Sequence, residues 1–167
     1  MAKATLAGAE TVAKNLKSVQ KRFLNEVNAD MERVRKLLDE RIGRNISLSD
    51  HSLSDLADLG HPYAARAPQA IHQPDYQVHV QSGKMLASKH SGVKPASVSA
   101  GKLTATAYAG VSDQVEHALY VVLGTSKMIP RDFLTGSLNE VKDQTINILR
   151  RSLKNTTVNF NGEKTKL

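Results

Sequence analysis

The chain carries the stretch Tyr120-Val-Val-Leu-Gly-Thr-Ser-Lys-Met-Ile-Pro-Arg-Asp-Phe-Leu134. Residues 120–123 are apolar and of types that favour a β-strand. Gly124 then permits a backbone conformation that side chains resist. Pro130 suits the first turn of a helix, because its missing N–H is unpaired there anyway. This order of residues predicts a strand at a sheet edge, a tight turn, a short loop and a helix.

The residues that follow Pro130 keep the spacing of one helix face. Their apolar side chains recur mostly at steps of three and four residues. The helix is therefore expected to run to about Leu153 and to cover the sheet. Its apolar positions are Phe133, Leu134, Leu138, Val141, Ile146, Leu149 and Leu153.

Residues 5–44 predict a second and longer helix. The segment has no proline, and its glycines are confined to Gly8 and Gly43 near the two ends. At ~1.5 Å per residue the helix would be about 60 Å long, which exceeds what one domain of this size needs. Its narrow apolar stripe fits either a seam between subunits or a helix that lies on its own domain. The stripe consists of Val12, Leu16, Val19, Phe23, Val27, Met31, Val34, Leu38 and Ile42.

Between the two helices the sequence alternates as strands do. Residues 76–80 alternate apolar and polar side chains, which predicts a half-buried strand. The alternation over residues 103–111, with a turn near residues 99–101, predicts a hairpin. Residues 84–96 fit either a loop or a second short strand around Met85, and residues 117–123 predict the last strand of the sheet.

The segment before these strands predicts little regular structure. Ser52-Leu-Ser-Asp55 has the form of a capping box and predicts a short helix over residues 53–59, which Gly60 ends. Residues 64–74 are small and proline-bearing, and they predict a loop.

These elements predict an α+β fold. It would consist of the long N-terminal helix, a small antiparallel β-sheet of three to four strands, and a C-terminal helix packed on the sheet. We expect residues 1–154 to form a single domain. Residues 155–167 carry few apolar side chains and predict a tail that is flexible or becomes ordered on a partner, to whose sheet edge it could add a strand.

The composition bounds the class of protein. The chain contains no cysteine, which excludes disulfides and thiolate metal sites. Its N-terminal residues lack the apolar core of a secretory signal. No apolar run approaches the ~18 residues that a membrane span needs. We therefore expect no membrane association.

The motifs of common enzymes are missing from the sequence. No Gly-X-Ser-X-Gly elbow occurs, and Gly124-Thr-Ser-Lys127 lacks the full spacing of a phosphate loop. The histidines are scattered and form no helical metal-binding pair. We expect no catalytic residue, no metal site and no cofactor. The histidines are His51, His61, His72, His79, His90 and His117.

Two segments resemble a bacteriophage family. Ala118-Leu-Tyr-Val-Val-Leu-Gly-Thr125, followed after a short gap by Pro130-Arg-Asp-Phe-Leu134, is similar to the pattern of small neck or tail-completion proteins of long-tailed phages, also described as head–tail joining or minor tail proteins. In that pattern an apolar strand ends in Glu-Gly-Thr, and Pro-X-Arg-Pro-Phe-Leu precedes the last helix. Here Leu123 stands in place of the Glu and Asp132 in place of the second Pro. Val78-His-Val-Gln-Ser-Gly-Lys-Met-Leu86 resembles the family's hairpin segment.

The resemblance implies a structural protein of the virion that is assembled in the host cytoplasm. Its subunits would form a closed ring in the neck, joining head-connector or stopper proteins to tail-terminator or tail-tube proteins around the DNA channel. Gly124 and Thr125 would form the corner after the strand. Pro130, Arg131 and Phe133 would set the last helix, with Phe133 buried. All five residues either hold the fold or contact a partner.

A small basic nucleic-acid-binding module is the alternative function. The net charge is +7, and residues 3–44 contain ten Lys or Arg against six Asp or Glu. This excess fits either ordinary solvated helix faces or contact with DNA phosphates. The aromatic residues are too few for a base-stacking platform. The basic residues expected to face DNA are Arg150, Arg151, Lys154, Lys164 and Lys166.

Overall fold

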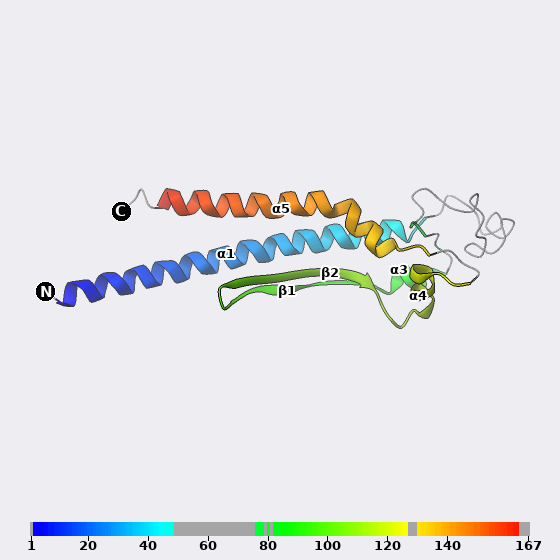
Figure 1. Cartoon of the computed structure of the whole chain (residues 1–167), viewed down its shortest axis with the longest axis horizontal. Coiled ribbons are helices and arrows are strands. Elements are labelled where there is room, and N and C mark those ends of the chain that lie inside the picture. Colours follow the sequence, from blue (N-terminus) through cyan, green and yellow to red (C-terminus); the bar gives the residue numbers. More distant parts are fainter. Residues whose placement is uncertain (1, 49–75, 79, 81, 127–129, 164–167) are drawn as a thin grey trace. The chain divides into compact units, whose positions relative to one another are not determined.

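The computed structural model describes residues 2–48, 76–78, 80, 82–126 and 130–163 (Figure 1). In this part of the chain the fold is α+β, with a long N-terminal helix, a two-stranded antiparallel sheet and a C-terminal helix. The short helix and the loop predicted between residues 53 and 74 lie outside the described residues. The elements are α1 (Ala2–Asn45), α3 (Lys84–Ala87), β1 (Lys89–Ser99), β2 (Lys102–Val111), α4 (Glu116–Leu123) and α5 (Phe133–Glu163).

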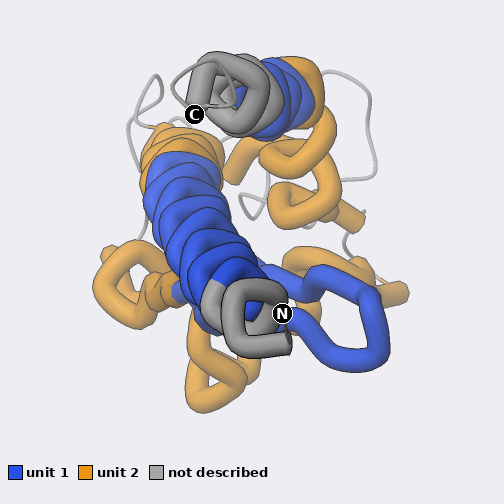
Figure 2. The backbone as a smooth tube through the Cα atoms, turned by 90° about the vertical axis from the view of Figure 1, so that its left-hand side faces the viewer, with its two compact units in different colours: residues 1–34, 93–107, 144–167 blue, residues 35–92, 108–143 orange. Residues whose placement is uncertain are grey.

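The chain divides into two compact units (Figure 2). Unit 1 comprises residues 1–34, 93–107 and 144–167, and unit 2 comprises residues 35–92 and 108–143. The helices α1 and α5 and the β1–β2 hairpin each contribute residues to both units. Each unit has buried apolar side chains of its own.

In unit 1 the apolar stripe of α1 is buried from Val27 onward. Val27, Met31 and Val34 are each at most 9% exposed. On the same helix Asn28 accepts a hydrogen bond through Oδ1 from the backbone N–H of Ala96 at 2.6 Å. This bond joins β1 to α1, and the long N-terminal helix predicted over residues 5–44 is confirmed.

The turn of the hairpin lies at Ala100 and Gly101. Their φ angles are 49° and 73°, and two positive values are what a tight two-residue turn of type I′ requires. The predicted hairpin is confirmed, but its first strand is longer than expected. Gly92 allows this, because a Cβ atom there would lie 2.5 Å from the hydroxyl oxygen of Tyr108 in β2. Close approach of a neighbouring side chain is a common reason for glycine in a strand.

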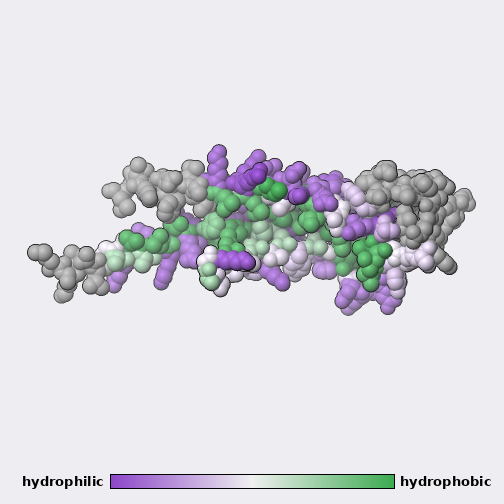
Figure 3. Space-filling view, viewed as in Figure 1, coloured by the Kyte–Doolittle hydropathy of each residue, from purple (hydrophilic) through white to green (hydrophobic). Residues whose placement is uncertain are grey.

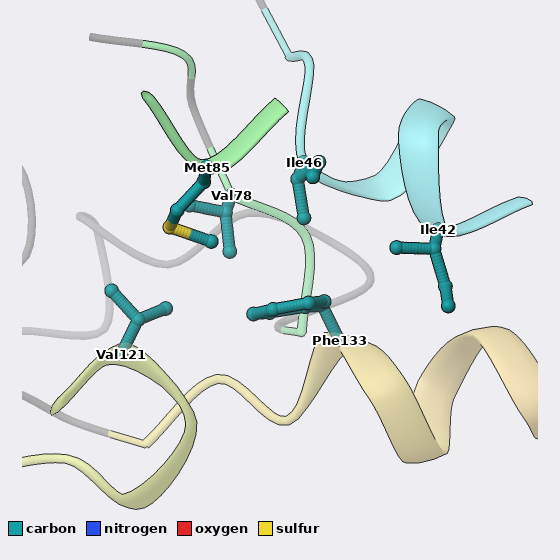
Figure 4. Packing of buried hydrophobic residues seen from close by; sticks show 6 residues of the cluster. All are labelled: Ile42, Ile46, Val78, Met85, Val121 and Phe133. Carbon is teal, nitrogen blue, oxygen red and sulfur yellow. The ribbon is translucent and has the colours of Figure 1, made fainter. Parts of the chain in front are cut away.

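In unit 2 one apolar cluster joins segments that are far apart in the sequence. Figure 4 shows these side chains pointing toward one another from α1 and the residue after it, from the segment that carries Val78, and from α3, α4 and α5. Their burial is the main favourable term for this unit, at roughly 25 cal/mol for each Å² of apolar surface removed from water. The cluster consists of Ile42, Ile46, Val78, Met85, Val121 and Phe133.

The strand predicted over residues 76–80 is present only as a short bridge. The backbone N–H of Leu48 donates to the carbonyl of Val78 at 3.2 Å, and the N–H of Val80 donates to the carbonyl of Leu48 at 3.0 Å. This pairing is separate from the β1–β2 sheet, whose described residues form two strands. The expected count of three to four strands is therefore not confirmed. Met85 lies in the helix α3 rather than in a loop or strand.

The prediction of a strand over residues 117–123 is wrong, because these residues form the helix α4. The N–H of Ala118 donates to the carbonyl of Val115 at 2.8 Å, and the N–H of Gly124 donates to that of Tyr120 at 2.8 Å. Val121 is buried in the unit 2 cluster, whereas Tyr120 is 54% exposed. The strand propensity of these residues is overridden by packing on one helix face.

The C-terminal helix begins three residues later than Pro130. The N–H of Arg131 donates to the carbonyl of Val121 at 2.8 Å, which holds the chain against α4 before the helix starts. Asp132 Oδ1 then accepts the N–H of Thr135 at 2.9 Å, as a helix N-cap does. The helix continues to Glu163, past the predicted end near Leu153. None of the described helices is long and apolar enough to cross a membrane.

Candidate interaction surface

The residues that carry the phage-like pattern lie in α4, in the turn after it and at the start of α5, all within unit 2. Gly124 follows the last residue of α4 with φ 74° and ψ 177°, a combination that is open almost only to glycine. Thr125 and Pro130 are exposed. The pattern therefore marks the point where the chain leaves α4.

Arg131 and Phe133 lie inside the unit. Arg131 is 1% exposed and Phe133 is fully buried. The ring of Phe133 packs in the cluster with Val121 and Ile42. In this chain the two residues fix the start of α5 against α4, and both side chains are buried in unit 2.

An open apolar groove runs beside α4 on the same unit. Its volume is about 520 Å³. Two acidic residues, Asp113 and Glu116, line it, and none of its described lining residues is Lys or Arg. The apolar lining residues are Val111, Val115, Ala118, Leu119, Tyr120, Val122, Phe133 and Leu134.

The surface of α4 is apolar as well. Leu119 is 59% exposed, Tyr120 is 54% exposed and Leu123 is 67% exposed. Figure 3 shows the hydrophobic atoms gathered over this helix. Single exposed apolar residues are common, but a contiguous group beside an apolar groove is typical of a protein-binding surface.

A second apolar surface lies on the N-terminal half of α1, in unit 1. Val12 is 59% exposed and Leu16 is 57% exposed. Residues four apart lie on one face of a helix, so both side chains extend the stripe that is buried from Val27 onward. Figure 3 shows hydrophobic atoms on this part of α1.

The basic residues expected to face DNA lie partly in the described chain. Arg150, Arg151 and Lys154 are exposed on α5, whereas Lys164 and Lys166 lie outside the described residues. Arg150 and Lys154 are four residues apart and share a helix face. Three cations on one stretch of helix form a small positive patch in unit 1.

A polar cluster around Glu140 was not predicted from the sequence. The Glu140 carboxylate accepts hydrogen bonds from Arg41, Asn45 and Tyr76. Burial raises the pKa of Glu140, but the bonds from Tyr76 and Asn45 and the charge of Arg41 lower it more, so that the pKa lies below its ordinary 4.5. Because the carboxylate is matched by these donors, the cluster acts as a structural joint between α1 and α5 within unit 2.

The described residues contain no group of three or more His, Cys, Asp or Glu side chains placed to hold a metal ion. His90 and His117 are exposed, and His51, His61, His72 and His79 lie outside the described part of the chain. In the described residues, the surface features that bear on function are the exposed apolar side chains of α4 and α1 and the basic residues of α5.

The groove was also missed at the level of sequence, since residues 117–123 were interpreted as the last strand of the sheet. A signal was present in the spacing of Leu119, Tyr120 and Leu123, which puts these side chains on one face of a short helix.

Comparison with known proteins gives no match: no family model matches the sequence, and neither a curated protein nor a solved structure matches the chain.

Proposed function

We propose that this chain is a structural virion protein that forms a ring at the phage head–tail junction. The ring would join the head connector to the tail tube around the DNA channel. The chain acts by assembly rather than by turnover, so its functional parts are surfaces. The proposal rests on the resemblance of residues 118–134 to neck and tail-completion proteins.

One structural observation supports it most. The residues of the phage-like pattern border the apolar groove beside α4, and Leu119 and Leu123 are more than half exposed. A chain that functions alone rarely keeps such a surface in water. A subunit that binds neighbouring subunits needs an apolar surface of this kind, because the contact buries it.

The second apolar surface, at Val12 and Leu16, supports the same function. Two different apolar surfaces on one chain allow a head-to-tail contact, in which one surface of each subunit meets the other surface of the next. Contacts of this type generate a ring when the rotation between subunits closes.

The test is electron microscopy of particles made when the gene is disabled in the phage that carries it. We expect DNA-filled heads and finished tails that are not joined. A plasmid copy of the gene should restore joined particles. Heads joined to normal tails in the absence of the gene would overturn the proposal.

The patch formed by Arg150, Arg151 and Lys154 favours nucleic-acid binding as a second candidate function. Such binding would depend on phosphate contacts and would weaken steeply with salt. Fluorescence anisotropy with duplex DNA separates the two functions. A neck protein should lose binding at moderate salt, whereas a dedicated DNA-binding module should retain it at physiological salt.

The matched variant for this experiment replaces all three cations by glutamine. If the patch carries the binding, the triple variant should bind duplex DNA more weakly and with a smaller salt dependence than the unchanged chain. The control replaces Lys14, Lys17 and Lys21 in α1 in the same way, which removes the same charge elsewhere. Equal weakening in both variants would show that only net charge matters.

A further inference from the structure

We propose that the apolar groove beside α4 holds the N-terminal half of α1 from a second copy of this chain. The inference rests on the proposed ring and names the contact that would build it. The groove lies wholly in unit 2, and the helix segment around Val12 and Leu16 lies wholly in unit 1.

The two surfaces match in chemistry. The groove is lined mostly by apolar residues, and the α1 segment offers an apolar stripe that continues from Val12 and Leu16 to Val19 and Phe23. An amphipathic helix that lays its apolar face into a hydrophobic groove is a recurrent mode of recognition. Val12 and Leu16 are 59% and 57% exposed, so docking would remove much of their apolar surface from water.

The two surfaces also match in charge. Among the described residues that line the groove, the charged ones are Asp113 and Glu116. Residues 8–22 of α1 contain four Lys or Arg and one Glu. At 100° per residue, Arg22 lies at the edge of the apolar stripe, and the three lysines lie on the opposite face. The helix can thus enter the groove with its apolar face, while the net positive charge of the segment favours its approach to Asp113 and Glu116.

The charge argues against a contact between two α4 helices. Such a symmetric contact would bring the acidic residues of both copies together, and like charges at an interface are unfavourable. The basic α1 segment avoids this repulsion.

The α1 segment that fills the groove belongs to another copy. A contact that closes a ring joins different copies, so the proposed ring takes the segment around Val12 from a neighbouring copy.

Thiol cross-linking of the full chain tests the contact. The natural sequence has no cysteine, so each introduced thiol is unique. The variants Leu16→Cys and Leu119→Cys replace exposed residues and should fold. They are purified separately, one with an affinity tag, then mixed and treated with a short bismaleimide. Mass spectrometry identifies the linked residues.

Two matched controls accompany the pair. Lys14→Cys is exposed on the face of α1 opposite the stripe, and Lys142→Cys is exposed on α5 outside the groove lining. We expect at least about tenfold more product between Leu16→Cys and Leu119→Cys than with either control, because docking raises the effective concentration of the two thiols.

Three results would overturn the inference. They are yields equal to those of the controls, a main product between two Leu119→Cys chains, and, in a chain that carries both Leu16→Cys and Leu119→Cys, a link within the one chain. Native mass spectrometry of the unchanged chain separates the two proposals. If rings form but Leu16→Cys and Leu119→Cys do not cross-link, the proposed contact is wrong and the proposed ring stands. If the chain stays monomeric at every concentration, both proposals are wrong.

Discussion

The side chain of Asn45, the last residue of α1, donates a hydrogen bond to Ser137 Oγ in α5 at 2.9 Å, and both residues are fully buried. The same amide donates to Glu140 at 3.1 Å, and its oxygen accepts from Gln77 at 3.2 Å. One buried amide therefore joins three segments of unit 2. Buried polar groups that lose such partners are costly.

The first prediction concerns this amide. Asn45→Ala should lower the free energy of unfolding by about 1–3 kcal/mol, because Ser137 and Gln77 each lose a buried partner. Urea unfolding followed by circular dichroism measures it. Arg44→Ala, at the exposed neighbouring position, is the control and should change stability by less than about 0.5 kcal/mol. Equal effects of the two changes would show that the buried bonds contribute nothing.

The second prediction concerns pH. The folded pKa of Glu140 lies below its ordinary 4.5, so the unfolded chain takes up the proton more readily. The resulting stability is present above about pH 4.5 and is lost as the pH falls through the folded pKa. Glu140→Gln should therefore be less stable than the unchanged chain at neutral pH, and the difference should shrink in acid.

Urea unfolding at a series of pH values measures this difference. Glu40→Gln, at an exposed position of α1, is the control for the loss of one carboxylate. Stability curves of Glu140→Gln and the unchanged chain that stay parallel from neutral pH into acid would contradict the prediction.

The parts of the fold that were predicted correctly have local signals. α1 keeps one apolar spacing from Val12 to Ile42, a pattern that is typical of a helix. The hairpin turn needs two residues with positive φ, and Ala100-Gly101 supplies a glycine at the second. In both elements the deciding information lies within a few residues of the structure it specifies.

The parts that were missed depend on contacts between distant residues. α4 is only eight residues long and contains Tyr120, Val121 and Val122, which favour strands in isolation. Its helix is held by the bond from Arg131 to Val121 and by burial in the cluster. The Glu140 cluster joins Arg41, Tyr76 and α5, which are far apart in the sequence, so no short sequence motif predicts it. The groove follows from α4 and was missed with it.

The third prediction concerns the core of unit 2. Phe133→Ala should cost about 3–5 kcal/mol of unfolding free energy, because the ring is fully buried and its loss leaves a cavity. Thermal and urea unfolding measure it. Leu138→Ala, on the same helix and 54% exposed, should be close to neutral. A near-neutral Phe133→Ala would mean that the cluster does not hold α5 in place.

The fourth prediction compares two glycines. Gly124→Ala should cost about 1–3 kcal/mol, because φ 74° with ψ 177° is strained for any side chain. Gly8→Ala should instead stabilise α1 by roughly 0.5–1 kcal/mol, since alanine favours a helix interior and nothing lies within 4 Å of a Cβ atom there. Urea unfolding compares them. If both changes alter the free energy of unfolding in the same direction, the backbone at Gly124 does not require glycine.

The last prediction separates assembly from folding. Leu119→Asp should abolish the oligomer and leave the melting temperature of the subunit nearly unchanged, because Leu119 is 59% exposed in the subunit and a carboxylate at this position would lose its hydration against the apolar face of α1. Sedimentation velocity measures the oligomer. Leu138→Asp makes the same change at a residue that is 54% exposed and outside the groove lining, and it should leave assembly intact. If Leu119→Asp assembles as well as Leu138→Asp, the groove is not the contact between subunits.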